Sequence, residues 1–428
     1  MPIHTHSLPS GLVVLVEPMS GTRSVALSWL LPAGSATVPN DEDGLPTLLS
    51  EMILRGAGAR DARAHSDALD RLGVQRSTNV STHHLHVGAT MLGSRLREAL
   101  PLLCDMVVSP TLPEQALDPT RSLALQSLEG LQDDPQERVM LQLKERHQPA
   151  PFNRHGLGRH EVLEGATIDQ LRGAWSRRFR PGGSILGVAG DVDPQDFLRQ
   201  LEDLLGAWQG SAPEPVEEEA APRGVVHLAE ETAQTHIALG WNAPRERDAD
   251  AMRERLLIRV LGSGSSSRLF QEVREKRGLC YSVYASYSSG RDSGMLSIYA
   301  GSTPQRAQLT LEVIAEQIAS LSHGVDRDEH ARAVVGLKSR LVMSGESSAA
   351  RAASIAADQF RLGRARTLDE IAREVDGVGL EDLQAYAARR RFEAPTLVDI
   401  GAEPVVWSTT AEGGRRAEAV KPAGQASR

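Results

Sequence analysis

Apolar residues recur at every second position near the start of the chain, which is the spacing of side chains on one face of a strand. They do so from Leu12 to Val16 and again from Val25 to Trp29. The segment Ser20–Ser24 between these stretches reads SGTRS, a composition typical of turns. The pattern therefore predicts an opening β-hairpin.

A helical pattern follows at residues 45–55. Apolar side chains spaced three and four residues apart form one stripe there, consisting of Leu45, Leu48, Leu49, Met52 and Ile53. Acidic residues at 41–43 precede the stripe, where they stabilise a helix N-terminus. Residues 113–145 also have a helical pattern and predict one or two helices.

A pattern of a helix followed by a strand occurs twice, about 210 residues apart. The first copy begins at Asp169 (DQLRGAWSRRFRPGGSILGVAGDVDP), and the second begins at Glu381 (EDLQAYAARRRFEAPTLVDIGAEP). In each copy a helix with a basic last turn leads through a turn containing Pro into a short apolar strand. A repeat of this length indicates a duplicated domain.

Composition marks the boundaries between the copies. The segment 210–223 is rich in Pro, Glu and Ala, which offer little to bury, and predicts a linker. The end of the chain, 409–428, is polar and Gly-rich and predicts a disordered tail. The expected domains are therefore 1–209 and 224–408. Because strands and helices mix without regular βαβ alternation, each domain should be α+β, with a mostly antiparallel sheet packed with helices.

Charge and composition exclude some classes of function. The formal net charge is −9, which argues against nucleic acid or an anionic membrane as partner. No apolar run approaches the roughly 20 residues of a membrane helix, and the N-terminus does not resemble a signal peptide. Cys104 and Cys280 stand among apolar neighbours and are interpreted as buried thiols. We therefore expect a cytoplasmic protein.

Three segments resemble the pitrilysin/insulinase family of zinc peptidases, which includes the mitochondrial processing peptidases. They are DGLPTLLSEMILRGAG, PFNRHGLGRHEVL with RFRPGGSILGVAGDVDP, and LGSGSSSRLFQEVREKRGLCYSVYASY. The resemblance extends from the opening LPSGLVVLVEP to about Trp407. It implies a pitrilysin-like fold of two homologous domains.

Active members of that family carry H-x-x-E-H on a helix. Two histidines bind zinc there, the intervening glutamate deprotonates the zinc-bound water, and a distant glutamate completes the site. The resemblance places the first ligand on Thr47, the general base on Ser50, the second ligand on Glu51 and the distant ligand on Ser127. Hydroxyls are poor zinc ligands and one carboxylate cannot hold the ion, so no metal is expected in this chain and helix 45–55 reads as an ordinary core helix.

Other candidate clusters have simpler explanations. His84 and His86 share a strand face without a nearby carboxylate or thiol, which favours a polar sheet surface over a metal site. The segment Ser263–Leu269 (SGSSSRL) lacks the Lys and the glycine spacing of a phosphate-binding loop, and its serines are interpreted as a helix N-cap. No G-x-S-x-G elbow is present.

Arg274 and Tyr281 are the candidate functional pair. The sequence predicts a helix from about Ser265, ended by Gly278, followed by a strand from Cys280. In active relatives an Arg and a Tyr at this spacing contact the scissile peptide, the Tyr as an oxyanion donor and the Arg through substrate carbonyls. The alternative is that Arg274 complements a helix C-terminus and Tyr281 packs on the sheet.

The first domain departs from the family in its substrate bed as well. Working members usually show Asn-Ala on the strand that borders the metal, where substrate adds as an extra strand, and this chain has Ser77-Thr78. The resemblance therefore implies a non-catalytic, substrate-binding subunit. Its expected partner is a catalytic paralogue with H-x-x-E-H, in a heterodimer that binds peptide and holds zinc only in the partner. The alternatives are a scaffold protein of the same fold with no role in proteolysis, and a self-sufficient peptidase with an unrecognised site.

Overall fold

The computed structural model describes residues 2–407 and the short strand β14 (Glu418–Ala419). The predicted tail, 409–428, lies outside the described residues except for β14. Within the described part of the chain, no helix has the length and apolar character needed to cross a bilayer.

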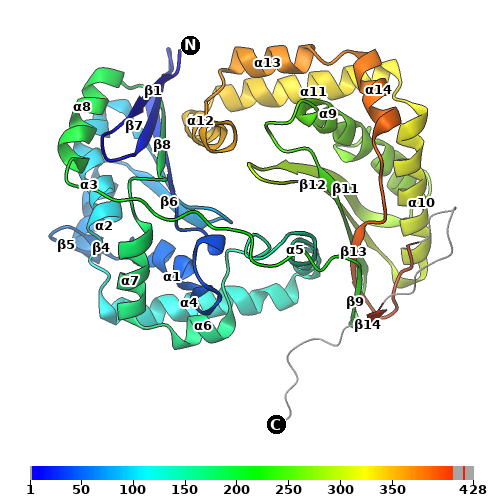
Figure 1. The fold of residues 1–428 in the computed structure, drawn as a ribbon, viewed down its shortest axis with the longest axis horizontal. Coiled ribbons are helices and arrows are strands. Elements are labelled where there is room, and N and C mark those ends of the chain that lie inside the picture. Colours follow the sequence, from blue (N-terminus) through cyan, green and yellow to red (C-terminus); the bar gives the residue numbers. More distant parts are fainter. Residues whose placement is uncertain (1, 408–417, 420–428) are drawn as a thin grey trace, which may run out of the picture. The chain divides into compact units, whose positions relative to one another are not determined.

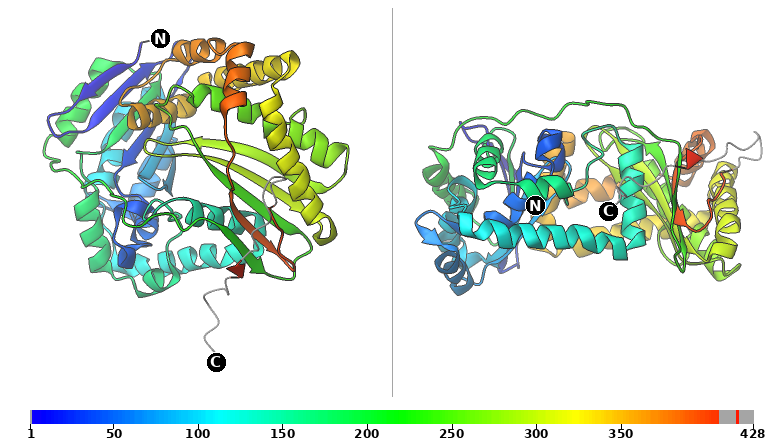
Figure 2. Two further views of the ribbon diagram at one scale, coloured as in Figure 1. Left: turned by 45° about the vertical axis from the view of Figure 1, so that its right-hand side comes forward. Right: turned by 90° about the horizontal axis from the view of Figure 1, so that it is seen from below.

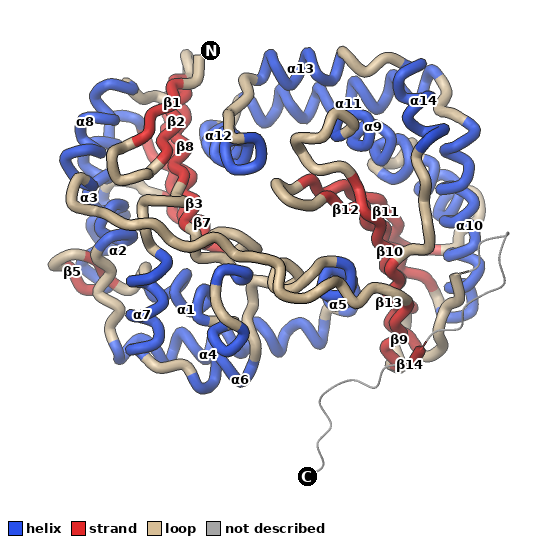
Figure 3. The backbone as a smooth tube through the Cα atoms, in the orientation of Figure 1, coloured by secondary structure: helices blue, strands red, loops and turns tan. Residues whose placement is uncertain are grey.

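The chain forms two compact units (Figures 1 and 3). The first unit consists of Met1–Gly130, Pro149–Ala220 and Val342–Leu368, and the second of Leu131–Gln148, Ala221–Leu341 and Asp369–Arg428. The predicted ranges 1–209 and 224–408 are continuous, whereas each compact unit includes one segment from the other half of the sequence. The predicted linker, 210–223, contains no named helix or strand.

The first unit contains a six-stranded sheet in the order β1-β2-β8-β3-β7-β6. Its strands are β1 (His4–Ser7), β2 (Val13–Pro18), β3 (Ser24–Leu31), β6 (Gln75–Val80), β7 (Leu85–Leu92) and β8 (Ile185–Gly190). The predicted opening hairpin is wrong, because β8 lies between β2 and β3, parallel to the first and antiparallel to the second. All six residues of β8 are buried, as expected of an inner strand.

The second unit contains a six-stranded sheet in the order β11-β12-β10-β13-β9-β14. Its strands, besides β14, are β9 (Val225–Ala229), β10 (Thr235–Ala243), β11 (Cys280–Ser289), β12 (Gly294–Ser302) and β13 (Thr396–Gly401). The parallel pair β9–β13 corresponds to the parallel pair β2–β8 of the first sheet, and the edge strand β11 corresponds to the edge strand β6. The repeated topology confirms the predicted α+β fold with a duplicated, mostly antiparallel sheet.

Helices cover one face of each sheet. In the first unit these are α1 (Leu45–Met52), α2 (Ala62–Arg71), α3 (Leu96–Val108), α4 (Leu117–Gly130), α6 (His160–Gly165), α7 (Ile168–Arg178) and α8 (Pro194–Leu205), with a small ribbon of β4 (Gly56–Ala57) and β5 (Arg60–Asp61). In the second unit they are α9 (Ala251–Gly262), the π-helix η6 (Phe270–Glu275), α10 (Ala307–Ser320), α11 (Arg327–Gly345, whose last four residues count with the first unit), α13 (Leu368–Asp376) and α14 (Leu380–Arg389). The repeated helix–strand pattern of the sequence corresponds to α7 with β8 and to α14 with β13.

The opposite face of each sheet is covered by a helix from the other half of the sequence. The helix α12 (Ser348–Leu362) packs on the first sheet, on the side away from α3 and α8, and α5 (Pro135–His147) packs on the second sheet, away from α10 (α12 is orange and α5 teal in Figures 1 and 2). Ile355 and Ala356 of α12 join Leu15 and Ile185 in one buried cluster. Val139 and Leu143 of α5 are buried in a cluster with residues of β9, β10, β12 and β13. We call this arrangement the helix exchange.

Candidate functional site

The helix α1 carries three of the four positions that the family resemblance assigns to a metal site. It begins after Gly44, whose φ of 140° is accessible to glycine but strained for other residues. The predicted apolar stripe, from Leu45 to Ile53, is at most 1% exposed. The helix packs against α4, α7 and the edge strand β6. The prediction of a core helix is therefore confirmed for 45–52, where the helix ends.

The hydroxyls at three of the four positions donate hydrogen bonds to backbone carbonyls. Thr47 Oγ1 donates to Gly156 O at 2.8 Å, and Ser50 Oγ donates to Thr47 O at 2.7 Å. Ser127 Oγ, on α4, donates to Leu123 O at 2.9 Å, one turn earlier in its own helix. Glu51 instead lies 3.8 Å from Arg55, which is four residues further on.

The loop that precedes α6 lies close to this face of α1. A Cβ at Gly158 would stand 2.5 Å from the Cα of Gly44, and a Cβ at Gly156 would stand 2.3 Å from the carbonyl oxygen of Val80 at the end of β6. The loop backbone therefore approaches both the start of α1 and the edge strand. The two glycines allow that approach, and it brings the Gly156 carbonyl within reach of Thr47.

The donor set on α1 and α4 does not suit zinc. Zinc sites in proteins use imidazole, thiolate and carboxylate groups, and here three of the four groups are neutral hydroxyls. Over residues 2–407, no three His, Cys, Asp or Glu side chains gather closely enough to share a metal ion.

Ser77 and Thr78 lie on β6, at the edge of the first sheet, where the resemblance puts the substrate bed. They pair with Gly88 and Val87 of β7, and α1 packs beside this strand. The outer backbone edge of β6 pairs with no further strand of the described sheet.

The two candidate histidines, His84 and His86, contact neighbouring side chains. His86 bonds through Nε2 to Ser28 Oγ at 2.9 Å and through Nδ1 to the Asn79 amide at 3.2 Å, and burial lowers its pKa. His84 is buried, with its ring 4.4 Å from the ring of Phe360 on α12. The prediction that these two histidines form a polar sheet surface holds only for the half-buried His86.

Arg274 lies in the π-helix η6, a wider helical turn than the α-helix predicted there. Its guanidinium stacks 4.9 Å from the ring centre of Phe270, and its Nε lies 3.9 Å from Glu275. The side chain is 46% exposed. Short π-helical turns shift the direction of the side chains that follow them and are frequent at functional sites. The predicted end of the helix is confirmed, because Gly278 has φ 58° and its N–H donates to Arg274 O at 3.0 Å.

Tyr281 is the extra residue of a β-bulge in β11. Cys280 pairs with Ser302 and Ser282 pairs with Gly301, so no residue of β12 lies opposite Tyr281. Bulges re-aim side chains and are common next to active sites. Tyr281 is 64% exposed, which is unusual for an aromatic side chain on a sheet.

The pair therefore presents a phenol and a guanidinium to solvent from adjoining elements. Cys280, the neighbour of Tyr281, is close enough to feel the charge of Arg274, although burial dominates and raises the pKa of its thiol to about 11. Both cysteines are free and buried, as predicted. Such an arrangement can donate hydrogen bonds to carbonyl oxygens of a bound chain.

The bulge shows in the burial pattern of the folded strand and not in the sequence, where Tyr281, Val283 and Ala285 follow a regular two-residue period. The buried positions of β11 begin at Cys280 and continue at Val283 and Ala285. The two-residue period of a strand thus slips by one between Cys280 and Val283, as an inserted residue requires. The sequence gives no signal for the π-helix either.

Two models of one protein family match the chain. Residues 13–158 match the model described as insulinase, peptidase family M16, and residues 165–337 match the model described as peptidase M16 inactive domain. A Bacillus subtilis protein, uncharacterized zinc protease YmxG, is 29% identical over 395 residues, which are 90% of this chain and 95% of that protein. An uncharacterized zinc protease of Streptomyces coelicolor is also 29% identical, over 92% of this chain and 88% of its own length.

Solved structures have the same fold. The structure described as the peptidase M16 inactive domain from Pseudomonas fluorescens aligns with a TM-score of 0.86 at 22% identity, over 95% of this chain and 99% of that one. A protease from Helicobacter pylori aligns with a TM-score of 0.83 at 18% identity, over 93% and 98% of the two chains. These structures show the shared fold, the two family models confirm the resemblance, and the chain belongs to peptidase family M16, the pitrilysin/insulinase family.

Proposed function

We propose that this chain is the non-catalytic, substrate-binding subunit of a heteromeric zinc metallopeptidase. Its Arg274 and Tyr281 would act in the active site of a partner that carries H-x-x-E-H and the zinc ion. The observation that carries the proposal is the exposure of Tyr281 on a bulge, beside the π-helix that holds Arg274. Side chains with only a structural role would contribute more to stability if they were buried than they do in this exposed position.

The residues at the four metal-site positions support the assignment of catalysis to the partner. The hydroxyls of Thr47, Ser50 and Ser127 donate hydrogen bonds to backbone carbonyl oxygens, so their role is structural. We therefore expect the chain alone to bind no stoichiometric zinc and to cleave no peptide. A cytoplasmic location remains a prediction of the sequence.

In the proposed reaction, the Tyr281 hydroxyl donates to the scissile carbonyl oxygen as negative charge develops on it. A donor aimed at that oxygen lowers the barrier because it stabilises the transition state more than the ground state. The Arg274 guanidinium would hold substrate carbonyls through its fork of N–H groups. The peptide bond itself would be attacked at the partner's metal.

The test is reconstitution with the catalytic partner. Tyr281→Phe removes one hydroxyl from an exposed side chain, so folding and pairing should persist while kcat falls about 10²–10³-fold, or ~3–4 kcal/mol. Arg274→Ala should lower kcat/KM, since its contacts also act in the ground state. Arg373→Ala is a matched control, because Arg373 is exposed on α13 and its loss should change neither constant.

Zinc analysis of each subunit accompanies the kinetics. The partner should contain about one zinc whichever variant it is paired with, and this chain should contain none. Wild-type turnover by a complex that carries both Tyr281→Phe and Arg274→Ala would remove the pair from the mechanism and favour the scaffold alternative. One zinc per isolated chain, with peptidase activity that Glu51→Gln abolishes, would contradict the non-catalytic assignment.

A further inference from the structure

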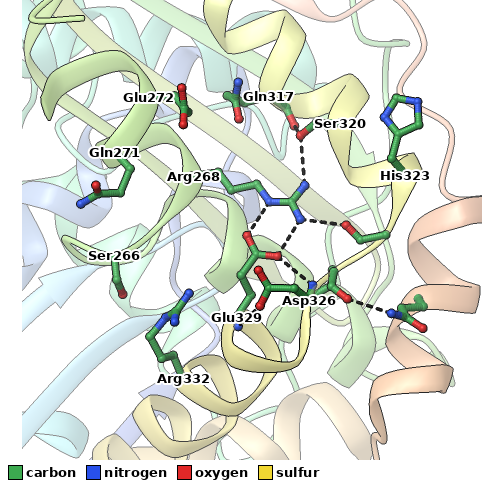
Figure 4. Close-up of a pocket in the computed structure, with 13 residues that line it drawn as sticks. Ser266, Arg268, Gln271, Glu272, Gln317, Ser320, His323, Asp326, Glu329 and Arg332 are labelled. Atoms are coloured by element: carbon green, nitrogen blue, oxygen red, sulfur yellow. Dashed lines mark hydrogen bonds and ion pairs between the residues drawn. The ribbon is translucent and has the colours of Figure 1, made fainter. Parts of the chain in front are cut away.

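Two adjoining pockets flank the segment that leads from α9 into the helix of Arg274. The larger, about 740 Å³, is lined by both acidic and basic side chains, among them Glu272, Asp326 and Arg268 (Figure 4). The smaller, about 220 Å³, lies between α9, the loop Ser263–Ser267 and α11. Ser266, Glu329 and Arg332 line both pockets.

The side chains that line the smaller pocket carry a net positive charge. Its single carboxylate, Glu329, already forms a two-point ion pair with Arg268, at 2.7 Å to each oxygen. Arg259 and Arg332 also line this pocket, and within residues 2–407 neither guanidinium has a hydrogen-bond or ion-pair partner. Burial and the charge of Arg340 lower the pKa of Arg259, so its charged form lacks compensation from the protein.

A glycine on α11 makes room for Arg259. A Cβ at Gly336 would stand 2.3 Å from Nη2 of Arg259 and 2.9 Å from its Cζ. Glycine inside a helix costs about 1 kcal/mol relative to alanine. The glycine therefore leaves the space that the Arg259 guanidinium occupies.

The serine loop adds neutral donors to the same pocket. Ser263, Ser265 and Ser266 line it, and their hydroxyls have no partner among the described residues. Of the serines interpreted as a helix N-cap, Ser267 directly precedes the helix, and its carbonyl oxygen accepts from Gln271 N–H at 3.0 Å. Its hydroxyl donates to Gly264 O at 2.7 Å and not to the helix, and the hydroxyls of Ser263, Ser265 and Ser266 cap no helix among the described residues.

We propose that the pocket between α9, the loop Ser263–Ser267 and α11 binds a phosphate group through Arg259, Arg332 and the serine hydroxyls. A tetrahedral phosphate accepts hydrogen bonds from several directions, which suits two guanidiniums with surrounding hydroxyls. The group belongs either to inorganic phosphate or to a larger phosphorylated molecule such as a nucleotide. This site is independent of the Arg274–Tyr281 pair.

Isothermal titration calorimetry of the full chain tests the site, with inorganic phosphate, ATP and acetate as separate titrants. We expect saturable binding of phosphate or ATP that is stronger than about 10 mM, and none of acetate. Replacing each arginine by Gln should weaken binding about tenfold, the usual contribution of a charge-assisted hydrogen bond. Arg373→Gln removes the same charge from exposed α13 and should leave binding unchanged.

Gly336→Ala provides a second variant that keeps every arginine. The added Cβ meets only the mobile end of Arg259, so the helix should become more stable while the guanidinium is displaced and phosphate binding weakens. Circular dichroism verifies the fold of each variant. Tighter binding of ATP than of inorganic phosphate would identify a phosphorylated molecule as the source. Absence of saturable binding to both, or equal binding by wild type and Arg259→Gln/Arg332→Gln, overturns the proposal.

Discussion

Arg351 is a guanidinium inside the first unit, with only 1% of its side chain exposed. It pairs with Glu17 of β2, which is 5% exposed, through Nη2 and Nε at 2.7 and 2.8 Å. Its Nη1 has no partner among the described residues. Such a pair depends on both members, because either charge alone would be buried without compensation.

We expect Arg351→Met to destabilise the chain by about 3–5 kcal/mol, because it leaves Glu17 in the core without its ion-pair partner. Urea unfolding at neutral pH measures this loss. The double variant Glu17→Leu/Arg351→Met removes both charges and should recover most of the stability. A single variant as stable as wild type would show that water compensates Glu17.

His147 is also buried, but its side chain is neutral, whereas that of Arg351 is charged. It is 1% exposed on α5, its Nδ1 lies 2.8 Å from Thr396 Oγ1, and its Nε2 has no partner in the described structure. Burial, with the charge of Arg223 as a smaller cause, lowers its pKa to about 4. The unfolded chain, with a His pKa near 6.5, therefore takes up a proton over a range where the folded chain does not.

This difference makes the contribution of His147 fully present above about pH 6.5 and progressively lost as the pH falls towards 4. The loss should amount to about 2–3 kcal/mol at pH 4.5. His147→Gln should therefore reduce the stability difference between pH 7 and pH 4.5, measured by urea unfolding. His4→Gln, on the exposed start of β1, should not change it.

At the scale of elements, the helix exchange depends on close approach of backbone to backbone. A Cβ at Gly187 of β8 would stand 2.3 Å from the carbonyl oxygen of Ala352 in α12. Neither atom belongs to a flexible side chain, so an added methyl must move the helix or the strand. The alanine-rich sequence of α12 suits this short separation.

Gly187→Ala should accordingly destabilise the first unit by about 1–3 kcal/mol, the usual cost of overpacking. Gly173→Ala, in α7, meets only the end of Arg177 and should instead stabilise its helix. Differential scanning calorimetry should show transition temperatures that shift in opposite directions. A Gly187→Ala variant that melts no earlier than wild type would contradict the close packing of α12.

Local patterns in the sequence predicted most elements but not their long-range partners. The apolar stripe of α1 and the turn at Gly278 are each encoded by residues that lie a few positions apart in the sequence. Both predictions are confirmed. The insertion of β8 between β2 and β3 joins residues far apart in the chain, which the alternation at 12–16 and 25–29 cannot reveal. The residues around Arg274 likewise give no sign of the π-helix in the sequence, and the family resemblance alone pointed to that residue.

For the whole molecule, the exchange means that neither half of the sequence contains a complete core. The first half lacks α12 for its own sheet, and it contains α5, which packs on the second sheet. The apolar faces concerned include Leu15 and Ile185 in the first unit and Val398 and Ile400 in the second, all 7% exposed or less. Each half alone would present such a face to water.

Separate expression of residues 1–216 and 217–428 should therefore give fragments that aggregate or unfold, while co-expression should restore a stable assembly. Co-purification through a tag on one fragment, with cooperative melting of the product, measures this. The expectation rests on burial of apolar surface, which drives folding of each unit. It fails if the fragment 1–216 alone is monomeric and melts as cooperatively as the intact chain.

The helix exchange also governs when the chain can finish folding during its synthesis. A ribosome releases the N-terminal part first, and domains generally fold as they emerge. In sequence order, β8 is the final strand of the first sheet, and it ends at Gly190. One face of that sheet stays uncovered until residues 348–362 have been synthesised. Throughout that interval the nascent chain exposes an apolar surface that has no cover of its own. This is the stage at which the growing polypeptide would most need a chaperone.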